Sequence, residues 1–218
     1  MYYFLLRYPG RTLVFVNSID AVRRIVPVLT NLRLPAIALH SQLRQKQRLK
    51  GLEKFKASEN SILISTDVAA RGLDIPHVQH VVHYHLPRAT DTYIHRSGRT
   101  ARGAEKGVSV LLCCPEEQKP LRQMVLKIDK SKFLKRMPDT FPVDRIIVSK
   151  LRRRVDLAQK IANASLEVER QGKEKSMFAE AADELGVDEN ELEEIVNSKG
   201  YGLSHFPPNF QEIWQAEG

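Results

Sequence analysis

Short apolar runs alternate with helical patterns along the first 115 residues. Residues 12–17 (TLVFVN) are almost continuously apolar, which is typical of a strand buried on both faces. Similar short runs follow at residues 36–39, 61–65, 79–84 and 107–112. Alternation of this kind predicts a parallel β-sheet with helices on both faces, so an α/β fold. In such a sheet the functional loops are expected beyond the carboxyl ends of the strands.

Two of the intervening helices can be predicted in some detail. Ser18 is a suitable N-cap for the first, and Pro27 inside that helix is expected to kink it. The first helix has apolar residues at helical spacing: Ile19, Val22, Ile25, Val26 and Leu29. The second is basic, starts at Arg44, and is expected to place three apolar residues on one face: Leu49, Leu52 and Phe55.

The pattern changes after Pro115. Residues 116–128 are expected to form one more helix, residues 130–142 a basic connector, and residues 145–171 a long helical stretch. A further pair of helices is expected around Gly186, which is a natural helix stop, and Asp188 with Glu191 suits the start of the last one. The predicted domains are therefore residues 1–128, a connector at 129–144, and a helical extension at 145–218.

Composition narrows the class of protein. The 218 residues are 42% hydrophobic and 28% charged, as in ordinary soluble domains, and no apolar run approaches the roughly 18 residues of a membrane span. The two cysteines, Cys113 and Cys114, are adjacent. Neighbouring strand residues point to opposite faces, so a disulfide between them is not expected, and two cysteines make no zinc site. Reduced thiols favour the cytosol or nucleus.

The net charge of +8 is unevenly distributed. Residues 1–150 hold 26 basic and 12 acidic side chains, whereas residues 151–218 hold 8 basic and 14 acidic ones. A basic body suits a polyanion such as nucleic acid, although many basic surfaces are only solvated. The acidic end is a poor site for RNA.

Three polar segments follow predicted strands or open a predicted helix. They are STDVAARGLD at 65–74, HRSGRTARG at 95–103 and QKQR at 45–48. In the second, Arg96, Arg99 and Arg102 recur every three residues, so helical spacing would place them on roughly one face, and neighbouring glycines allow close approach of a ligand. Clustered guanidiniums suit phosphate groups. Each segment alone is also compatible with a solvated turn, a helix cap or a solvent-facing helix.

Together, in this order, the segments resemble the C-terminal core domain of DEAD-box RNA helicases over about residues 1–128. LVFVNS (13–18) is similar to the family's motif IV, and HSQLRQKQR (40–48) to its QxxR element. STDVAARGLDIP (65–76) is similar to motif V, and YIHRSGRTAR (93–102) to motif VI. The resemblance implies a RecA-like, P-loop NTPase-like sheet and ATP-driven remodelling of RNA.

The resemblance implies roles at the nucleotide. Arg99 and Arg102 would be arginine fingers on its phosphates, and His95 would join the network that senses the γ-phosphate. Gly72 and Asp74 would lie beside the nucleotide, with Asp74 near the ribose.

It also implies an RNA-binding set and a coupling set. The expected RNA-binding residues are Thr66, Arg48, Gln45 and Ser18. Those expected to couple this domain to another are Arg71, Arg96 and Asp67, and Phe15 would pack under the arginines of motif VI. One departure falls beside the RNA set, because Ser41-Gln42 stands where the family usually has Gly-Asp.

Several family elements do not occur in these residues. There is no GxxxxGK[ST] phosphate loop, no D-E-A-D string and no adenine-reading Gln segment. We therefore expect ATP with Mg²⁺ to be held mainly by an N-terminal RecA-like domain, no metal to be bound by these residues, and this chain alone to be inactive. Because Met1 falls within an apparent helix, the chain is expected to begin inside a longer protein.

Less specific positions lie in YYFLLRYPGRTLVFVNSI (2–19), QKQRL (45–49) and VQHVVHYHLPRATDTYIHRSGRTAR (78–102). They resemble the branch that contains DEAD-box helicase 24 and its fungal Mak-five counterpart. This resemblance implies nucleolar maturation of the large ribosomal subunit, with pre-rRNA and ribosome-assembly proteins as partners and no membrane. Two interpretations of the extension stay open. It is either a brace that packs an apolar stripe (Ile146, Leu151, Val155, Leu157, Ile161) on the core, or a platform for RNA or protein around Arg152–Arg154.

Two alternatives to the helicase hypothesis also stand. One is a non-catalytic RNA-binding or assembly module with the same fold, and the other is a DNA-directed translocase. Absence of a phosphate-loop segment upstream would favour the first, and binding that does not depend on the 2′-hydroxyl would favour the second.

Overall fold

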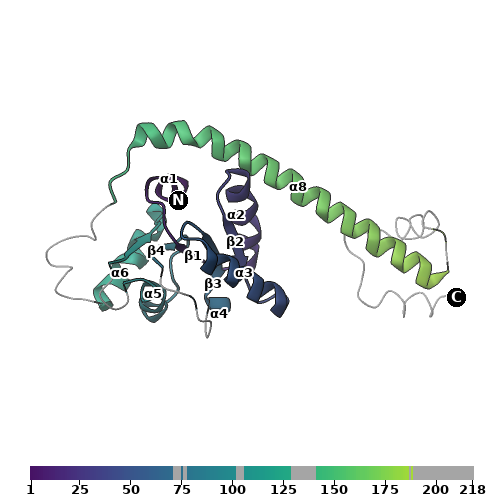
Figure 1. Ribbon diagram of the computed structural model, residues 1–218, viewed down its shortest axis with the longest axis horizontal. Helices are drawn as coiled ribbons and strands as arrows, with labels where there is room; N and C mark the ends of the chain where they lie inside the picture. Colours follow the sequence, from purple (N-terminus) through teal and green to yellow (C-terminus); the bar gives the residue numbers. More distant parts are fainter. Residues whose placement is uncertain (71–74, 76–77, 102–105, 129–140, 187, 189–218) are drawn as a thin grey trace. The chain divides into compact units, whose positions relative to one another are not determined.

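The computed structural model describes residues 1–70, 75, 78–101, 106–128, 141–186 and 188 (Figure 1). Contacts divide the chain into two compact units, residues 1–162 and residues 163–218. The predicted domain limits at residues 128 and 144 stay predictions. All the strands and the candidate site lie in the first unit.

The first unit is built on a five-stranded sheet in which every pair of neighbours is parallel. In spatial order the strands are β2 (Ala36–Leu39), β3 (Ile62–Thr66), β1 (Thr12–Val16), β4 (His80–His83) and β5 (Val108–Leu111). The strands β1 and β3 are buried at every residue, as their continuous apolar runs predict. The predicted parallel α/β fold is confirmed.

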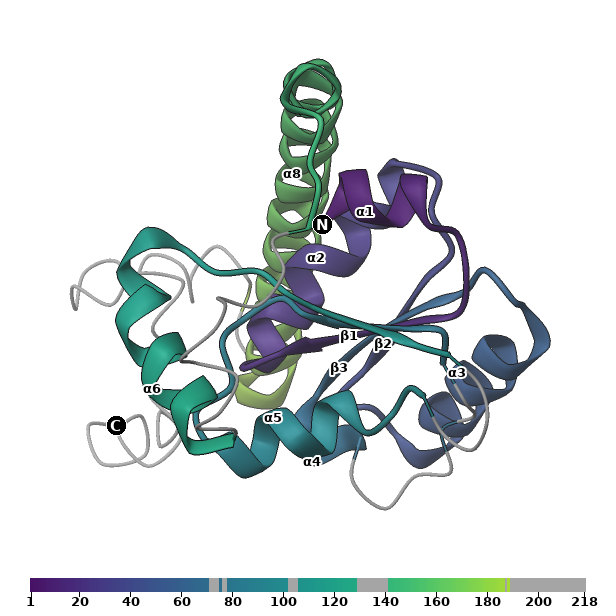
Figure 2. The same cartoon turned by 90° about the vertical axis from the view of Figure 1, so that its left-hand side faces the viewer.

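Helices cover both faces of the sheet (Figure 2). One face carries α1 (Tyr2–Arg7), α2 (Ile19–Asn31) and the first part of α8 (Arg145–Leu185). The opposite face carries α3 (Gln45–Ala57) and α4 (Asp67–Ala70). The other elements of the described residues are α5 (Thr90–Ser97), the 3₁₀ helix η1 (Pro115–Glu117) and α6 (Gln118–Ile128).

The first two predicted helices are present, with one difference. Ser18 caps α2 by accepting a hydrogen bond from the Ala21 amide at 3.2 Å, and α2 continues through Pro27. In α3, Leu52 and Phe55 are buried, but Leu49 is 50% exposed, so the prediction that all three share the core face is wrong. At about 100° per residue, Leu49 lies roughly 90° around the helix from the mean direction of Leu52 and Phe55.

The long helix α8 differs from the prediction at its middle. The prediction ended this helical stretch at residue 171, but the helix continues through Gly172 to Leu185. One glycine costs only about 1 kcal/mol inside a helix, which good helix formers on either side offset. The helix stops before Gly186, whose φ is +67°, as predicted. Most of the predicted connector and the last predicted helix, apart from Asp188, lie outside the described residues.

Only part of the predicted apolar stripe of α8 packs on the core. Leu151 and Val155 pack there, and Ala158 and Ala162 are buried. The Asn31 side chain donates to the Ala158 carbonyl at 3.2 Å. In contrast, the remaining three residues of the predicted stripe are 70%, 56% and 52% exposed: Ile146, Ile161 and Leu157. The two alanines were not in the predicted stripe, yet their small side chains let α8 approach α2 closely.

None of the helices that the structure describes combines enough length with enough apolar character to cross a membrane.

Candidate functional site

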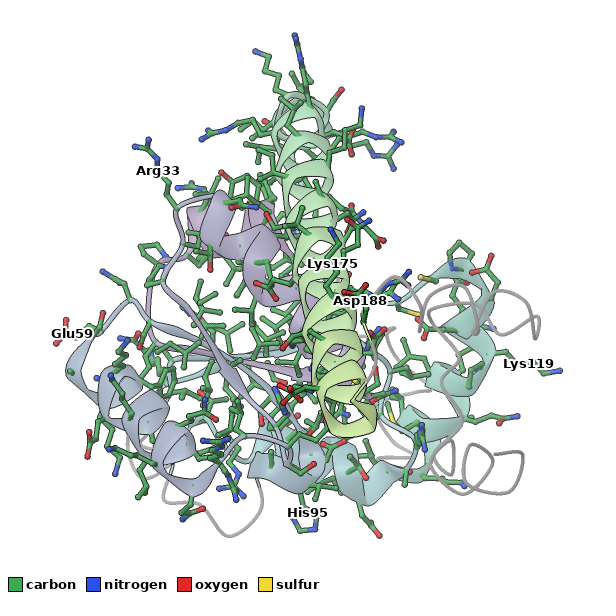
Figure 3. The ribbon with its side chains drawn as sticks, turned by 90° about the vertical axis from the view of Figure 1, so that its right-hand side faces the viewer. Arg33, Glu59, His95, Lys119, Lys175 and Asp188 are labelled. Atoms are coloured by element: carbon green, nitrogen blue, oxygen red, sulfur yellow. The ribbon has the colours of Figure 1, made fainter. Side chains whose placement is uncertain are left out.

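The predicted functional residues gather at the carboxyl ends of four strands. Ser18 follows β1, Gln45 opens α3 after β2, and Thr66 ends β3. His95 lies in α5, which follows β4. Parallel strands present these ends at one edge of the sheet, so segments far apart in sequence share one surface. In Figure 3 the exposed side chain of His95 points outward from α5.

Arg96 lies at the centre of this edge and is only 2% exposed. Its Nε and Nη2 donate to Asp67 Oδ1 and Oδ2 at 2.6 and 2.7 Å, a two-point ion pair. Nη2 also donates to Asn17 Oδ1 at 2.9 Å, and Nη1 to the His85 carbonyl at 3.0 Å. One buried guanidinium therefore ties together the ends of β1, β3 and β4.

Aromatic rings lie beneath this guanidinium. The Phe15 ring centroid is 5.2 Å from the Arg96 guanidinium carbon, which confirms that Phe15 packs under an arginine of motif VI. His83 stacks on Tyr93 with centroids 5.0 Å apart. Burial, reinforced by the positive charge of Arg96, lowers the pKa of His83 to about 4, so the ring is neutral at pH 7.

His83 also joins two hydroxyl groups. Its Nε2 lies 3.2 Å from the Ser97 Oγ and 3.1 Å from the Ser109 Oγ, and the two hydroxyls are 3.1 Å apart. This cluster connects the end of α5 to β4 and β5. It therefore fixes the point at which the chain leaves α5 toward Arg99.

Arg96 and Arg99 do not share a face, so that part of the prediction is wrong. The helix α5 ends at Ser97, and Gly98 is its C-cap. Arg99 therefore lies beyond the helix, half-buried, while Arg96 points into the domain. Next to Arg99, the Thr100 hydroxyl donates to the Val78 and Gln79 carbonyls at 2.5 and 3.1 Å, which anchors the turn.

The predicted RNA-binding residues lie on adjacent loops. Arg48 is half-buried and reaches Gln45 Oε1 and the Ala69 carbonyl, both at 3.5 Å. It thus bridges α3 to α4, which directly follows Thr66. Thr66 is 8% exposed, and Ser18 caps α2. Their RNA-binding roles stay predictions.

The coupling set is only partly visible. Asp67 and Arg96 bind each other within this domain, so any effect on another domain would pass through the loops that they position. Four predicted site residues lie outside the described residues: Arg71, Gly72, Asp74 and Arg102. Their roles stay predictions.

Sequence reasoning missed three residues of this cluster: Asn17, His83 and His85. The Asn17 side chain donates to the Leu86 carbonyl at 3.0 Å, and its backbone N–H donates to His85 Nδ1 at 3.2 Å. Burial, as the largest influence, holds the pKa of His85 below its ordinary value. The available signal was a polar residue directly after an apolar strand, such as Asn17 after β1, at the edge of the sheet where functional loops are expected.

The site suits an anion better than a cation. In the part of the chain that the structure describes, no group of three or more His, Cys, Asp or Glu side chains could hold a metal ion. Asp67 already binds Arg96 through both carboxylate oxygens. Mg²⁺ requires oxygen ligands, so the described residues do not fit it, whereas guanidiniums fit the phosphates of a nucleotide or RNA.

Comparison with known proteins agrees with this geometry. The helicase conserved C-terminal domain matches residues 2–104. One similar solved structure is that of the E. coli DEAD-box protein SrmB bound to regulator of ribonuclease activity A. It is 30% identical with a TM-score of 0.54, and the match covers 66% of this chain and 88% of that one. Mss116p DEAD-box helicase domain 2 bound to an RNA duplex is 29% identical with a TM-score of 0.53, covering 67% and 57%. The chain therefore belongs to the DEAD-box helicase family, as a C-terminal RecA-like domain.

Within the family, the similar curated relatives include proteins named MAK5 and ddx24. ATP-dependent RNA helicase MAK5 of Gibberella zeae is 54% identical over 93% of this chain and 27% of that protein. The MAK5 of Candida albicans is 49% identical over 87% and 26%, and ddx24 of Dictyostelium discoideum is 49% identical over 86% and 19%. The predicted branch is confirmed. The chain spans 27%, 26% and 19% of the length of these relatives.

Proposed function

We propose that the chain is the C-terminal half of an ATP-dependent RNA helicase that remodels RNA or ribonucleoprotein. The observation that carries this is the Arg96 cluster, which joins three strand ends and holds the turn from which Arg99 projects. A rigid turn of this kind positions a guanidinium before the reaction, which is what stabilisation of a phosphoryl transition state requires.

In this proposal Arg99 and Arg102 act on a nucleotide that another domain holds. Their positive charge stabilises the negative charge that spreads over the γ-phosphoryl group during transfer, and His95 senses that group. ATP and RNA together close the two domains, which bends the strand and separates a short duplex; hydrolysis reverses this. ATP with Mg²⁺ is held mainly by the N-terminal RecA-like domain, so this chain alone is inactive.

RNA is held by its phosphates in the same proposal. Ser18, Gln45, Arg48 and Thr66 form the grip on adjacent loops. Backbone contacts carry no sequence information, so binding is independent of sequence and weakens steeply with salt.

The test uses the intact protein with its N-terminal domain. Arg99→Ala and Arg102→Ala are each expected to lower RNA-stimulated ATP hydrolysis by about 10³-fold or more, because each removes transition-state charge stabilisation. RNA binding should change less than about threefold, since neither residue belongs to the RNA grip. The measurements are steady-state ATPase rates with saturating RNA and equilibrium RNA binding.

The matched control is Arg122→Ala, which removes an exposed arginine from α6 and should leave both readouts unchanged. ATPase activity that survived either finger substitution would refute the arginine-finger assignment. An intact protein that bound RNA but never hydrolysed ATP would instead favour a non-catalytic RNA-binding module.

We also propose a cellular role: action on pre-rRNA in large-ribosomal-subunit biogenesis, in the nucleolus of the nucleus, with ribosome-assembly proteins contacting the C-terminal extension. Support comes from the resemblance to the branch described above. A tagged intact protein should co-sediment with pre-ribosomal particles and be displaced by RNase. Sedimentation only as free protein would contradict this role.

A further inference from the structure

A hydrogen bond joins the helix α2 to the loop between β2 and α3, beside the predicted RNA grip. Arg23 Nη2, from α2, donates to Gln42 Oε1 at 2.7 Å, and Gln42 lies between β2 and α3. Both residues are exposed. Arg23 lies five residues after Ser18, and Gln42 lies three residues before Gln45. The bond therefore links the two segments that supply the grip at this end of the sheet.

The partner of Arg23 is neutral, which distinguishes it from the next arginine. Arg24 forms an ion pair with Asp20 at 3.0 Å, one turn earlier on the same helix. Arg23 has no such pair with a described carboxylate. A Gln amide oxygen orients the guanidinium without cancelling its charge, and most of the guanidinium's five N–H donors stay available.

Asp20, three residues before Arg23 on the same helix, is paired with Arg24, and the neighbouring His40 adds no charge. His40 is 5% exposed, and burial first, then the charge of Arg23, holds the pKa of His40 below its ordinary value. His40 is therefore neutral at pH 7. Arg23 is thus an oriented, exposed cation beside a surface that we assign to phosphates.

We propose that Arg23, oriented by Gln42, binds a phosphate of the RNA strand next to those held by Ser18 and Gln45. This inference rests on the proposed RNA-binding function and extends its grip along α2. It also gives a reason for the Gln at position 42. The family's usual Asp there would form an ion pair with Arg23 and withdraw its charge from RNA.

The experiment measures binding of the 218-residue chain to a short RNA duplex over a range of salt concentrations. Arg23→Gln should weaken binding by about 3- to 10-fold at low salt and reduce the slope of log affinity against log salt by about 1. Gln42→Asp should do the same although Arg23 remains, because the new carboxylate neutralises it. Thermal unfolding of each variant checks that the fold is kept.

Arg24→Gln is the matched control, because it removes the same charge from the neighbouring position of α2. Arg24 is already paired with Asp20, so its loss should change affinity by less than about twofold and leave the salt slope unchanged. Equal effects of the Arg23 and Arg24 substitutions would show that only net charge matters and would overturn the inference.

A further variant separates this inference from the proposed function. If Arg48→Gln weakens binding of the duplex while Arg23→Gln and Gln42→Asp do not, the RNA grip stands and the role of Arg23 is refuted. If the unsubstituted chain shows no salt-dependent binding of RNA at all, the proposed RNA grip itself is refuted, and the inference falls with it.

Discussion

Arg96 shows how one buried charge organises the site. Removing a guanidinium from water is costly, and the cost is offset only where its donors are met by acceptors with good geometry. Here Asp67 takes two donors, and Asn17 and the His85 carbonyl take two more hydrogen bonds. The charge therefore does more to fix the relative positions of three loops than to add net stability.

Asp67→Asn tests this interpretation. The substitution leaves Arg96 buried without its anion, so we expect the free energy of unfolding to fall by about 3 kcal/mol. The matched control is Asp20→Asn, which breaks the exposed Arg24–Asp20 pair and removes an acid from the first turn of α2; it should cost at most about 1 kcal/mol. Urea denaturation measures both. Similar losses would mean that the Arg96 cluster is not the organising contact.

The buried His83 ring predicts a dependence of stability on pH. Its pKa in the fold is about 4, against an ordinary 6.5, so the unfolded chain takes up the proton first as pH falls. Burial of the neutral ring therefore costs no stability above pH 6.5. As pH falls toward 4, protonation of the unfolded chain lowers the free energy of unfolding, by on the order of 3 kcal/mol in total. His83→Gln should flatten this part of the stability profile.

The control for His83 is His95→Gln, which changes an exposed histidine and is expected to leave the profile as it was. If the His83 and His95 variants lost stability in parallel between pH 6.5 and 4, other groups would account for the pH dependence. Denaturant midpoints measured at several pH values decide between these outcomes.

At the scale of elements, periodicity predicted which segments form helices and strands better than it predicted their faces. Leu49 and Ile146 fit apolar stripes on paper, yet both are at least half exposed. A three-residue repeat drifts by about 60° per step around a helix, so a stripe chosen by eye leaves the buried face within two steps. The pattern of apolar residues does not mark Ala158 and Ala162 as buried, because alanine occurs on both the buried and the exposed faces of helices.

The functional loops were more predictable than the helix faces. Family motifs placed Phe15 under a motif VI arginine correctly, because the order of strands fixes which loops meet. The motifs did not predict that Arg96 points inward while Arg99 leaves the helix. That difference depends on the end of α5 at Ser97, where Gly98 is the C-cap, and on the hydroxyl contacts of Ser97 and Thr100.

At the scale of the whole molecule, the first unit includes part of a helix that sequence patterns assigned to a separate extension. Residues 145–162 of α8 belong with the first unit by their contacts; Ala158 packs in the core cluster that includes α2, and Ala162 is also buried. The charge pattern instead indicated a separate extension, since acidic residues outnumber basic ones over residues 151–218 as a whole. The acidic residues are concentrated beyond 162, so an average over 151–218 hides the basic start of α8.

Two truncations distinguish these boundaries. A chain ending at Ala162 keeps every contact of the first unit, so its midpoint of thermal unfolding should lie within about 2 °C of that of the full chain. A chain ending at Asp144 loses Leu151, Val155 and the two alanines and exposes the core beneath them. Burial of those side chains contributes a few kcal/mol, so its midpoint should fall by about 10 °C or more. Equal midpoints for the two truncations would show that α8 is not part of the folded core and would favour the predicted boundary at residue 144.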